Sequence, residues 1–273
     1  MSFAPLAPTV RAEPREIAPD TWVVHSVQEA LGAPLLVHLN SMVIKGSEPV
    51  IIDTNTPANR AQWLDDVFEL VEPEDVRWVF LSHDDVDHTG NLDIVMDRCP
   101  NATLVASWPM TERHSNAFTF PLDRCRWIND GDAFDAGDRT LRAVRPPLYD
   151  SPTTRGLFDE TTGVYWAVDS FACPMPGQVM ESAAEFEDQH WREGMAMFMY
   201  HALSPWLSIV DQDKYRASVN VSRGLGATAI ATAHSPVIPA DKVDAAYDLI
   251  LEMPSIVPPP CPDDSVLRAI LGG

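Results

Sequence analysis

The residues best suited to chemistry lie together in the segment HDDVDH, which begins at residue 83. Its four candidate metal ligands are His83, Asp85, Asp87 and His88. Imidazoles and carboxylates at this close spacing offer nitrogen donors and hard oxygen donors, which is the chemistry that binds metal ions. A loop can direct such side chains to different sides, so the segment predicts a site for two metal ions lying a few ångströms apart.

The same segment has a simpler interpretation as a solvated acidic turn. That interpretation has some support, because 19 Lys and Arg residues stand against 40 Asp and Glu residues and the formal net charge is −21. The two histidines that frame the carboxylates nevertheless favour a metal site, since metals in proteins recruit imidazole together with carboxylate. Asp84, the remaining acid of the segment, is expected to face solvent or to cap the residues that follow.

Three further candidate ligands lie at the ends of later segments with strand character. Asp150 follows the segment 141–148, Asp169 follows VYWAV, and His234 follows AIATA. Taken singly, these residues suit a turn, a helix cap and a hydrogen-bonded core histidine. Because sites in α/β proteins are commonly built where strands end, the three are predicted to join the same site.

Alternating strand and helix patterns must position these residues. Strands are predicted at 21–25, 35–39, 42–45, 50–53, 77–82, 103–107 and 227–233, with further strands and turns over 124–169. Helices are predicted at 57–69, 92–97, 110–116, 185–213 (interrupted near Pro205) and 240–251. The buried strand over 77–82 leads directly into HDDVDH.

The alternation favours one layered α/β domain over residues 1–273, because no strong linker or internal repeat divides the chain. Its core is expected over about 21–251. The tail over 254–273 begins with a proline-rich stretch, and this stretch, over 254–262, is expected to be extended.

Composition excludes several classes of protein. A domain this acidic repels phosphate backbones and anionic lipid, so neither nucleic acid nor a membrane surface is an expected partner. No apolar run approaches the roughly 20 residues that a membrane span needs, and the opening MSFAPLAPTVRAEPRE lacks the pattern of a secretory signal. The 4 cysteines lie far apart without a C-x-x-C pair, which argues against a thiolate site and suits the cytoplasm.

The order of these motifs resembles the metallo-β-lactamase superfamily over most of the predicted core. Its hydrolases carry H-x-H-x-D-H, whereas Asp85 stands here at the second histidine position. An acid at that position is similar to the diiron domain of flavodiiron proteins and related oxygen-binding diiron proteins. The segments NSMVI (40–44), DSF (169–171) and AHSP (233–236) carry further similarity. The resemblance implies a four-layer αβ/βα sandwich, with two mixed sheets face to face and helices outside.

The resemblance also implies a role for each candidate ligand. One metal would take His83 and Asp85, the second would take Asp87, His88 and His234, and Asp169 would bridge the two.

This chain departs from the family at one ligand, because Asp150 stands where the family has a histidine. Asp150 could bind as a carboxylate, or the first site could be weakened; Tyr149 beside it is a poorer candidate. One imidazole and three carboxylates at the first site would favour iron or manganese over zinc, since hard oxygen donors suit those ions.

Three residues outside the ligand set are candidates for a supporting role. Asp53 resembles an aspartate that supports a ligand in the superfamily, although a strand-end turn is an equally open interpretation. Tyr200 and His201 resemble a family region that approaches the metal pocket, and an ordinary helix face is the alternative.

The resemblance implies two metal ions as cofactors, with iron favoured and manganese and zinc as alternatives. Flavodiiron enzymes carry a C-terminal flavodoxin domain, but no phosphate-cradling loop for a flavin is found in this sequence, so an external electron donor is expected instead. The resemblance also implies a homodimer.

Three functions remain open at this point. The first is a diiron oxidoreductase that binds or reduces dioxygen or nitric oxide. The second is a metal-dependent hydrolase of an ester, thioester or lactone, and the third is a non-catalytic diiron oxygen sensor. Asp85 and Asp150 favour the first and the third over the second.

Overall fold

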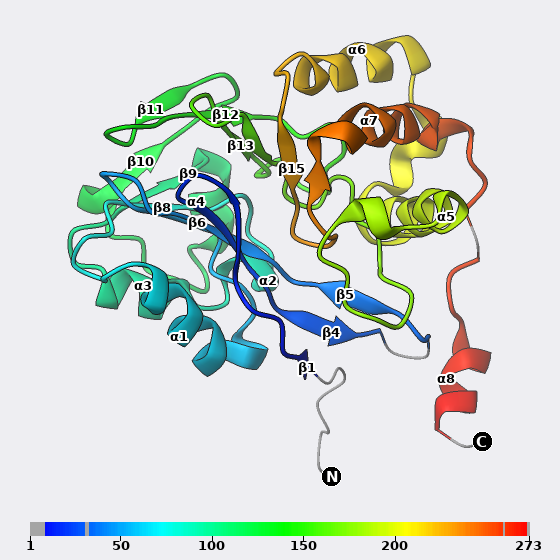
Figure 1. Cartoon of the computed structure of the whole chain (residues 1–273), viewed down its shortest axis with the longest axis horizontal. Helices are drawn as coiled ribbons and strands as arrows, with labels where there is room; N and C mark the ends of the chain where they lie inside the picture. The colour runs from blue at the N-terminus through cyan, green and yellow to red at the C-terminus, as the bar shows by residue number, and fades with distance from the viewer. Residues whose placement is uncertain (1–8, 31–32, 259, 272–273) are drawn as a thin grey trace.

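Two large β-sheets organise the chain, as the computed structural model shows for residues 9–30, 33–258 and 260–271 (Figure 1). The predictions that fall on residues 1–8 (part of the opening segment) and on Pro259 of the tail concern residues outside these described ranges. Among the described residues, no helix has the length and apolar character required to cross a membrane.

The first large sheet has 7 strands in the order β10-β9-β8-β7-β6-β3-β2. Their bounds are β2 (Arg15–Ala18), β3 (Thr21–Val24), β6 (Ser41–Ile44), β7 (Val50–Ile52), β8 (Trp78–Phe80), β9 (Thr103–Ala106) and β10 (Cys125–Trp127). Strands β2, β3, β6 and β7 pair antiparallel, and β7 to β10 pair parallel. The parallel half brings the ends of β7 and β8, which precede Asp53 and HDDVDH, to the same edge.

The second large sheet has 6 strands in the order β11-β12-β13-β14-β15-β16. Their bounds are β11 (Ala133–Asp135), β12 (Thr140–Val144), β13 (Gly156–Asp159), β14 (Val164–Trp166), β15 (Ala229–Ala231) and β16 (Ile238–Pro239). Strands β14 and β15 pair parallel, so the segments leading to Asp169 and His234 leave the sheet in the same direction.

The inner faces of the two sheets pack against each other. Side chains alternate across a strand, so Ile52 and Phe80 face inward and meet Leu157 and Trp166 of the second sheet. All four are at most 1% exposed. This dry interface fixes the two sheet edges that carry the candidate ligands.

The outer face of the first sheet is covered by α1 (Arg60–Leu70), α3 (Leu92–Arg98) and α4 (Trp108–His114). Ile51 and Val79, which alternate with the inward residues, pack there with Trp63 and Val67 of α1.

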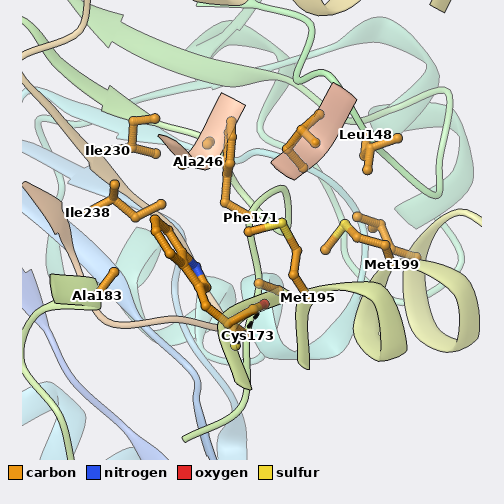
Figure 2. Packing of buried hydrophobic residues seen from close by; sticks show 14 of the residues in the cluster. Leu148, Phe171, Cys173, Ala183, Met195, Met199, Ile230, Ile238 and Ala246 are labelled. Atoms are coloured by element: carbon orange, nitrogen blue, oxygen red, sulfur yellow. Dashed lines mark hydrogen bonds between the residues drawn. The ribbon is translucent and has the colours of Figure 1, made fainter. Parts of the chain in front are cut away.

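The outer face of the second sheet is covered by α5 (Asp188–Phe198), α6 (Gln212–Arg223) and α7 (Val243–Glu252). Figure 2 shows Met195 of α5 beside Phe171, with Ile230 and Ile238 of the sheet and Ala246 of α7 completing the cluster. The arrangement is helix, sheet, sheet, helix, and the predicted αβ/βα fold class is confirmed.

Several local predictions were incomplete. The predicted helix over 185–213 is divided into α5, a π-helical turn η4 (Met199–Leu203), a 3-10 helix η5 (Pro205–Ile209) and the start of α6. A small sheet of β1 (Thr9–Val10), β4 (Val27–Glu29) and β5 (Leu36–His38) was only partly foreseen.

A short 3-10 helix, η7 (Met253–Ser255), takes in the first two residues of the stretch predicted to be extended. After that stretch the tail contains a helix that was not predicted, α8 (Asp264–Ile270). The side chain of Asp263 caps α8 by accepting the backbone N–H of Ser265. No residue of α8 is buried, and the helix lies apart from the layers in Figure 1.

Candidate metal centre

The HDDVDH segment presents its side chains in two directions because a helix begins within it. Strand β8 ends at Phe80, and α2 (Val86–Thr89) starts directly after Asp85. His83 and Asp85 therefore belong to the loop, whereas Asp87 and His88 belong to the first turn of α2.

Asp169 lies at the centre of the candidate site. Its Oδ2 atom is 3.3 Å from His83 Nε2. Its Oδ1 atom is 3.1 Å from His88 Nε2 and 3.2 Å from His234 Nε2. The two carboxylate oxygens thus face two different sets of imidazoles, which is the arrangement of a bridging ligand.

The remaining carboxylates lie on either side of this centre. Asp85 Oδ2 is 3.7 Å from His83 Nε2, on the first side. Asp87 Oδ2 is 3.4 Å from His234 Nε2 and 3.6 Å from His88 Nε2, on the second side. The carboxylates are thereby divided between the same two sets of imidazoles as the oxygens of Asp169.

Asp150, where this chain departs from the family pattern, lies on the first side. One potential ligand atom from each of His83, Asp85 and Asp150 falls within 4.8 Å of the others, and the same holds for Asp87, His88 and His234. The fold therefore brings all seven candidate ligands together in two groups around Asp169.

Hydrogen bonds at Nδ1 orient the three imidazoles. His234 Nδ1 lies 2.9 Å from the carbonyl oxygen of His38, which only accepts, so this nitrogen carries the proton. Ser82 Oγ donates to Asp53 and lies 3.1 Å from His83 Nδ1. With Nδ1 engaged, the Nε2 lone pairs are directed at the centre, as in metal-bound histidine.

Asp53 is the hub of this supporting network. Its Oδ1 accepts the backbone N–H of Ser82, and its Oδ2 accepts from the Ser82 hydroxyl, from Trp166 Nε1 and from His88 Nδ1 at 2.9 Å. The carboxylate is 0% exposed. This placement agrees with a role in supporting a ligand, the alternative that the sequence left open.

The buried polar groups of the site favour positive charge between them. His83 Nε2, His88 Nε2 and Asp169 Oδ1 are buried without a hydrogen-bond partner among the described residues. Burial acts to lower the pKa of each of the three imidazoles, yet the neighbouring carboxylates prevail and all three pKa values are raised. Burial acts to raise the pKa of Asp169, but His83 and His88 hold it well below its usual range. Cations between these groups would satisfy the unpartnered atoms, so the residues fit a metal centre.

The pKa values of Asp85 and Asp150, the two carboxylates of the first side, shift in opposite directions. The neighbouring imidazole of His83 lowers the pKa of Asp85. Partial burial raises the pKa of Asp150, although the residue as a whole is exposed.

Two residues at the site have a backbone φ angle in the left-handed region. Val168, directly before Asp169, has φ of 58°, and Asp53 has φ of 59°. The left-handed region is unfavourable for a β-branched residue such as valine, and strain of this kind clusters at functional sites. In this conformation the Val168 carbonyl accepts from Ala233 N and Thr232 Oγ1, which joins the Asp169 and His234 segments.

A cavity of about 260 Å³ opens onto the carboxylates Asp85, Asp87, Asp150 and Asp169. The apolar part of its lining consists of Val37, Leu39, Phe198, Ala202 and Leu203. The Phe198 ring centroid lies 5.0 Å from that of His234. Sequence reasoning missed this apolar lining, because apolar residues in a helical pattern give no signal for a site.

The structure also bears on Tyr200 and His201, for which two interpretations were left open, and on Asp84. The Tyr200 hydroxyl donates to the Met253 carbonyl at 2.8 Å, and neither Tyr200 nor His201 is among the residues lining the cavity. A role of the Tyr200 hydroxyl at the centre is therefore not supported. Asp84 neither faces solvent freely nor caps α2, since its side chain is 11% exposed and binds Arg113 and Thr153.

Comparison with known proteins places this geometry in a family. A family model described as "ODP family beta lactamase" matches residues 37–234. A putative diflavin flavoprotein A 1 of Thermosynechococcus vestitus is 29% identical over 133 residues, which is 48% of this chain and 23% of that protein. An anaerobic nitric oxide reductase flavorubredoxin of Vibrio vulnificus is 21% identical over 133 residues and is covered to 27%. The matched region thus spans about a quarter of these relatives.

Solved structures share the fold at low identity. Rubredoxin oxygen:oxidoreductase of Desulfovibrio gigas superposes with a TM-score of 0.75 at 14% identity, covering 88% of this chain and 61% of that one. The flavodiiron protein of Giardia intestinalis gives 0.77 at 17% identity, covering 90% and 60%. A fragment of putative diflavin flavoprotein A 5 of Nostoc sp. gives 0.72 at 17% identity, covering 92% and 98%.

The resemblance inferred from the motifs is confirmed by these matches. The family match includes the whole run of candidate ligands from His83 to His234. The chain therefore belongs to the ODP family beta lactamases, within the metallo-β-lactamase fold.

Proposed function

We propose that this chain holds two iron ions and uses them to bind or reduce dioxygen or nitric oxide with electrons from an external donor. The first ion would be held by His83, Asp85 and Asp150, the second by Asp87, His88 and His234, with Asp169 between them. The observation that carries the proposal is the division of the two Asp169 oxygens between His83 on one side and His88 and His234 on the other.

The donor set supports iron over zinc. The first group offers one imidazole and two carboxylates besides Asp169, and the second offers two imidazoles and one carboxylate. Oxygen-rich surroundings suit iron or manganese, and their negative charge stabilises the higher oxidation state. Manganese and zinc remain the alternatives that metal analysis distinguishes.

The cavity supports a small substrate. Its volume of about 260 Å³ lies below the range of about 300–1,000 Å³ that is typical of pockets for drug-sized ligands. A lining that combines apolar side chains with a cluster of carboxylates suits a small, weakly hydrated molecule. Two relatives carry names that refer to oxygen and to nitric oxide, and we extend these two substrates to this chain as part of the proposal.

The bound metals would supply redox activity and Lewis acidity beside the carboxylates that line the cavity. The residues of the chain contribute orientation and exclusion of water. The hydrogen bonds at Nδ1 of His83, His88 and His234 hold the rings in place. Phe198 and Leu203 contribute apolar surface to the lining of the cavity.

The test measures the consumption of dioxygen and of nitric oxide by the iron-loaded protein. A chemical reductant and a mediator supply the electrons, and the protein is transferred under anaerobic conditions. We expect consumption of at least one gas that depends on the reductant, and its loss in Asp169→Asn. Hydrolysis of simple esters or lactones without gas consumption would instead favour the hydrolase. An optical change with oxygen but no turnover would favour the sensor.

We also propose a cytoplasmic homodimer. The described cysteines Cys99, Cys125, Cys173 and Cys261 are all free, which agrees with a reducing compartment. Met195, Met199 and Leu203 are buried in the core of the subunit, so these apolar residues do not supply a dimer surface. Light scattering tests the dimer, and a monomer at micromolar concentration would contradict it; cell fractionation tests the location.

A further inference from the structure

The segment that carries Asp150 is tied to the HDDVDH loop by Asp84. Asp84 Oδ1 accepts the Thr153 hydroxyl at 2.7 Å and lies 3.4 Å from Ser151 Oγ. Its Oδ2 accepts from Arg113 Nε at 2.8 Å. Since Asp84 stands between His83 and Asp85 in the chain, this contact joins the two pieces of backbone that would form the first metal site.

The two sides of the centre differ in how firmly they are held. The histidines of both sides are buried, with His83 0%, His88 1% and His234 7% exposed, so the difference lies in the carboxylates. On the second side, the Asp87 side chain is 23% exposed. On the first side, the Asp85 side chain is 53% exposed, and Asp150 is also exposed. The first side therefore depends more on local tethers than on burial.

Hydrogen bonds extend the tether through the segment 150–155. The Thr153 and Ser151 hydroxyls lie 2.7 Å apart, and the Thr154 hydroxyl reaches Asp150 Oδ1 at 3.3 Å. Ser107 Oγ donates to the Thr153 carbonyl at 2.9 Å. Asp84 thus contacts the buried side of the segment whose other side presents Asp150 to the site.

We propose that Asp84 is a positioning residue that places Asp150 for the first metal and has little effect on the second. The inference rests on the proposed dinuclear centre. It assigns a function to Asp84, a carboxylate that is not itself a candidate ligand. The hydrogen bonds between Asp84 and the segment 150–155 would then set the affinity of the first metal.

The tether can be broken without changing its charge. Thr153→Val removes the hydroxyl that Asp84 accepts, and Thr153→Ser keeps a hydroxyl at that position. Substitution of a residue behind a metal ligand typically lowers metal affinity about 10- to 100-fold. We expect a loss in this range for the more weakly held iron in Thr153→Val and Asp84→Ala, little change for the other iron, and near wild-type binding in Thr153→Ser.

Anaerobic titration with Fe²⁺, followed by iron content per chain, measures both steps. Asp97→Asn, a charge change at an exposed position of α3, is the control for net charge. In an Asp150→Ala background, which should keep only the second iron, Asp84→Asn should leave binding of that iron unchanged, because Asp84 is proposed to act on the first site alone. Circular dichroism of each variant shows whether it is folded.

Three outcomes would overturn the inference. The first is unchanged binding of both irons in Thr153→Val. The second is equal weakening of both irons in Asp84→Ala, which would reveal a general charge effect. In both cases the wild type still binds two irons, so the proposed function stands. The third is a wild type that binds fewer than two irons, which would overturn the proposed function together with this inference.

Discussion

Replacing Asp53 by Asn tests whether the network behind the candidate centre supports both the fold and the metals. Asp53 is fully buried and accepts four hydrogen bonds, one at Oδ1 from the Ser82 backbone and three at Oδ2 from Ser82 Oγ, His88 Nδ1 and Trp166 Nε1. Asparagine has nearly the same shape but only one acceptor oxygen. In either orientation of the amide, its NH₂ group faces at least one buried donor.

The magnitude follows from this mismatch. A buried donor without an acceptor costs about 1–3 kcal/mol, so Asp53→Asn should lower the free energy of unfolding of the metal-free protein by about that amount. The loss of a carboxylate behind a ligating histidine should weaken the metal at His88 about 10- to 100-fold. Orienting the amide oxygen toward His88 would then leave the Ser82 backbone N–H facing the amide nitrogen.

Urea unfolding of the metal-free protein and iron titration measure the two effects separately. Asp97→Asn serves again as the control, because an exposed substitution usually changes stability by less than about 0.5 kcal/mol. If Asp53→Asn behaves like this control in both measurements, the network has no supporting role. Asp53 would then be an ordinary strand-end residue.

Three further predictions concern the ligands themselves. Asp169→Ala should be the most damaging ligand substitution, because one carboxylate serves both ions, and retention of two metals per chain with unchanged spectra would refute the bridging role. Asp150→Ala should lose the first metal and keep the second, whereas Asp150→His should shift the preference toward zinc; a full complement of two ions in Asp150→Ala would mean that Asp150 only stabilises its turn. The metal-free protein should lose stability as pH rises. The folded-state pKa values of His83, His88 and His234 lie above the ordinary 6.5, so their contribution is complete below about pH 6.5 and is lost as pH rises through the higher folded-state values. Thermal unfolding of metal-free and metal-loaded protein across this range checks the sign, and a metal-free protein that becomes more stable from pH 6.5 upward would contradict it.

The fold and the grouping of the candidate ligands could largely be predicted from the sequence. The ligands follow strands with strong apolar patterns, such as the run before HDDVDH, and strands β7, β8, β14 and β15 deliver them to adjoining edges of the two sheets. A strand followed by ionisable residues is a local pattern, and the parallel pairing of neighbouring strands turns it into a site.

Other features depend on contacts that no local pattern encodes. Asp84 looks like any acid of an acidic turn until the fold brings Thr153 and Arg113 to it. The positive φ of Val168 opposes the preference of its own side chain and is imposed by the surrounding hydrogen bonds. The π-helical turn η4 contributes Ala202 and Leu203 to the lining of the cavity. Its sequence nevertheless continues the pattern of the helix before it.

The most direct test of the central claim is anomalous diffraction at the iron edge, from crystals of protein purified without added metal. We predict two peaks per chain on either side of the Asp169 carboxylate, one beside His83 and Asp150 and the other between His88 and His234. A single peak, or two peaks elsewhere, would contradict the dinuclear centre. Zinc in place of iron would contradict the assignment of the metal.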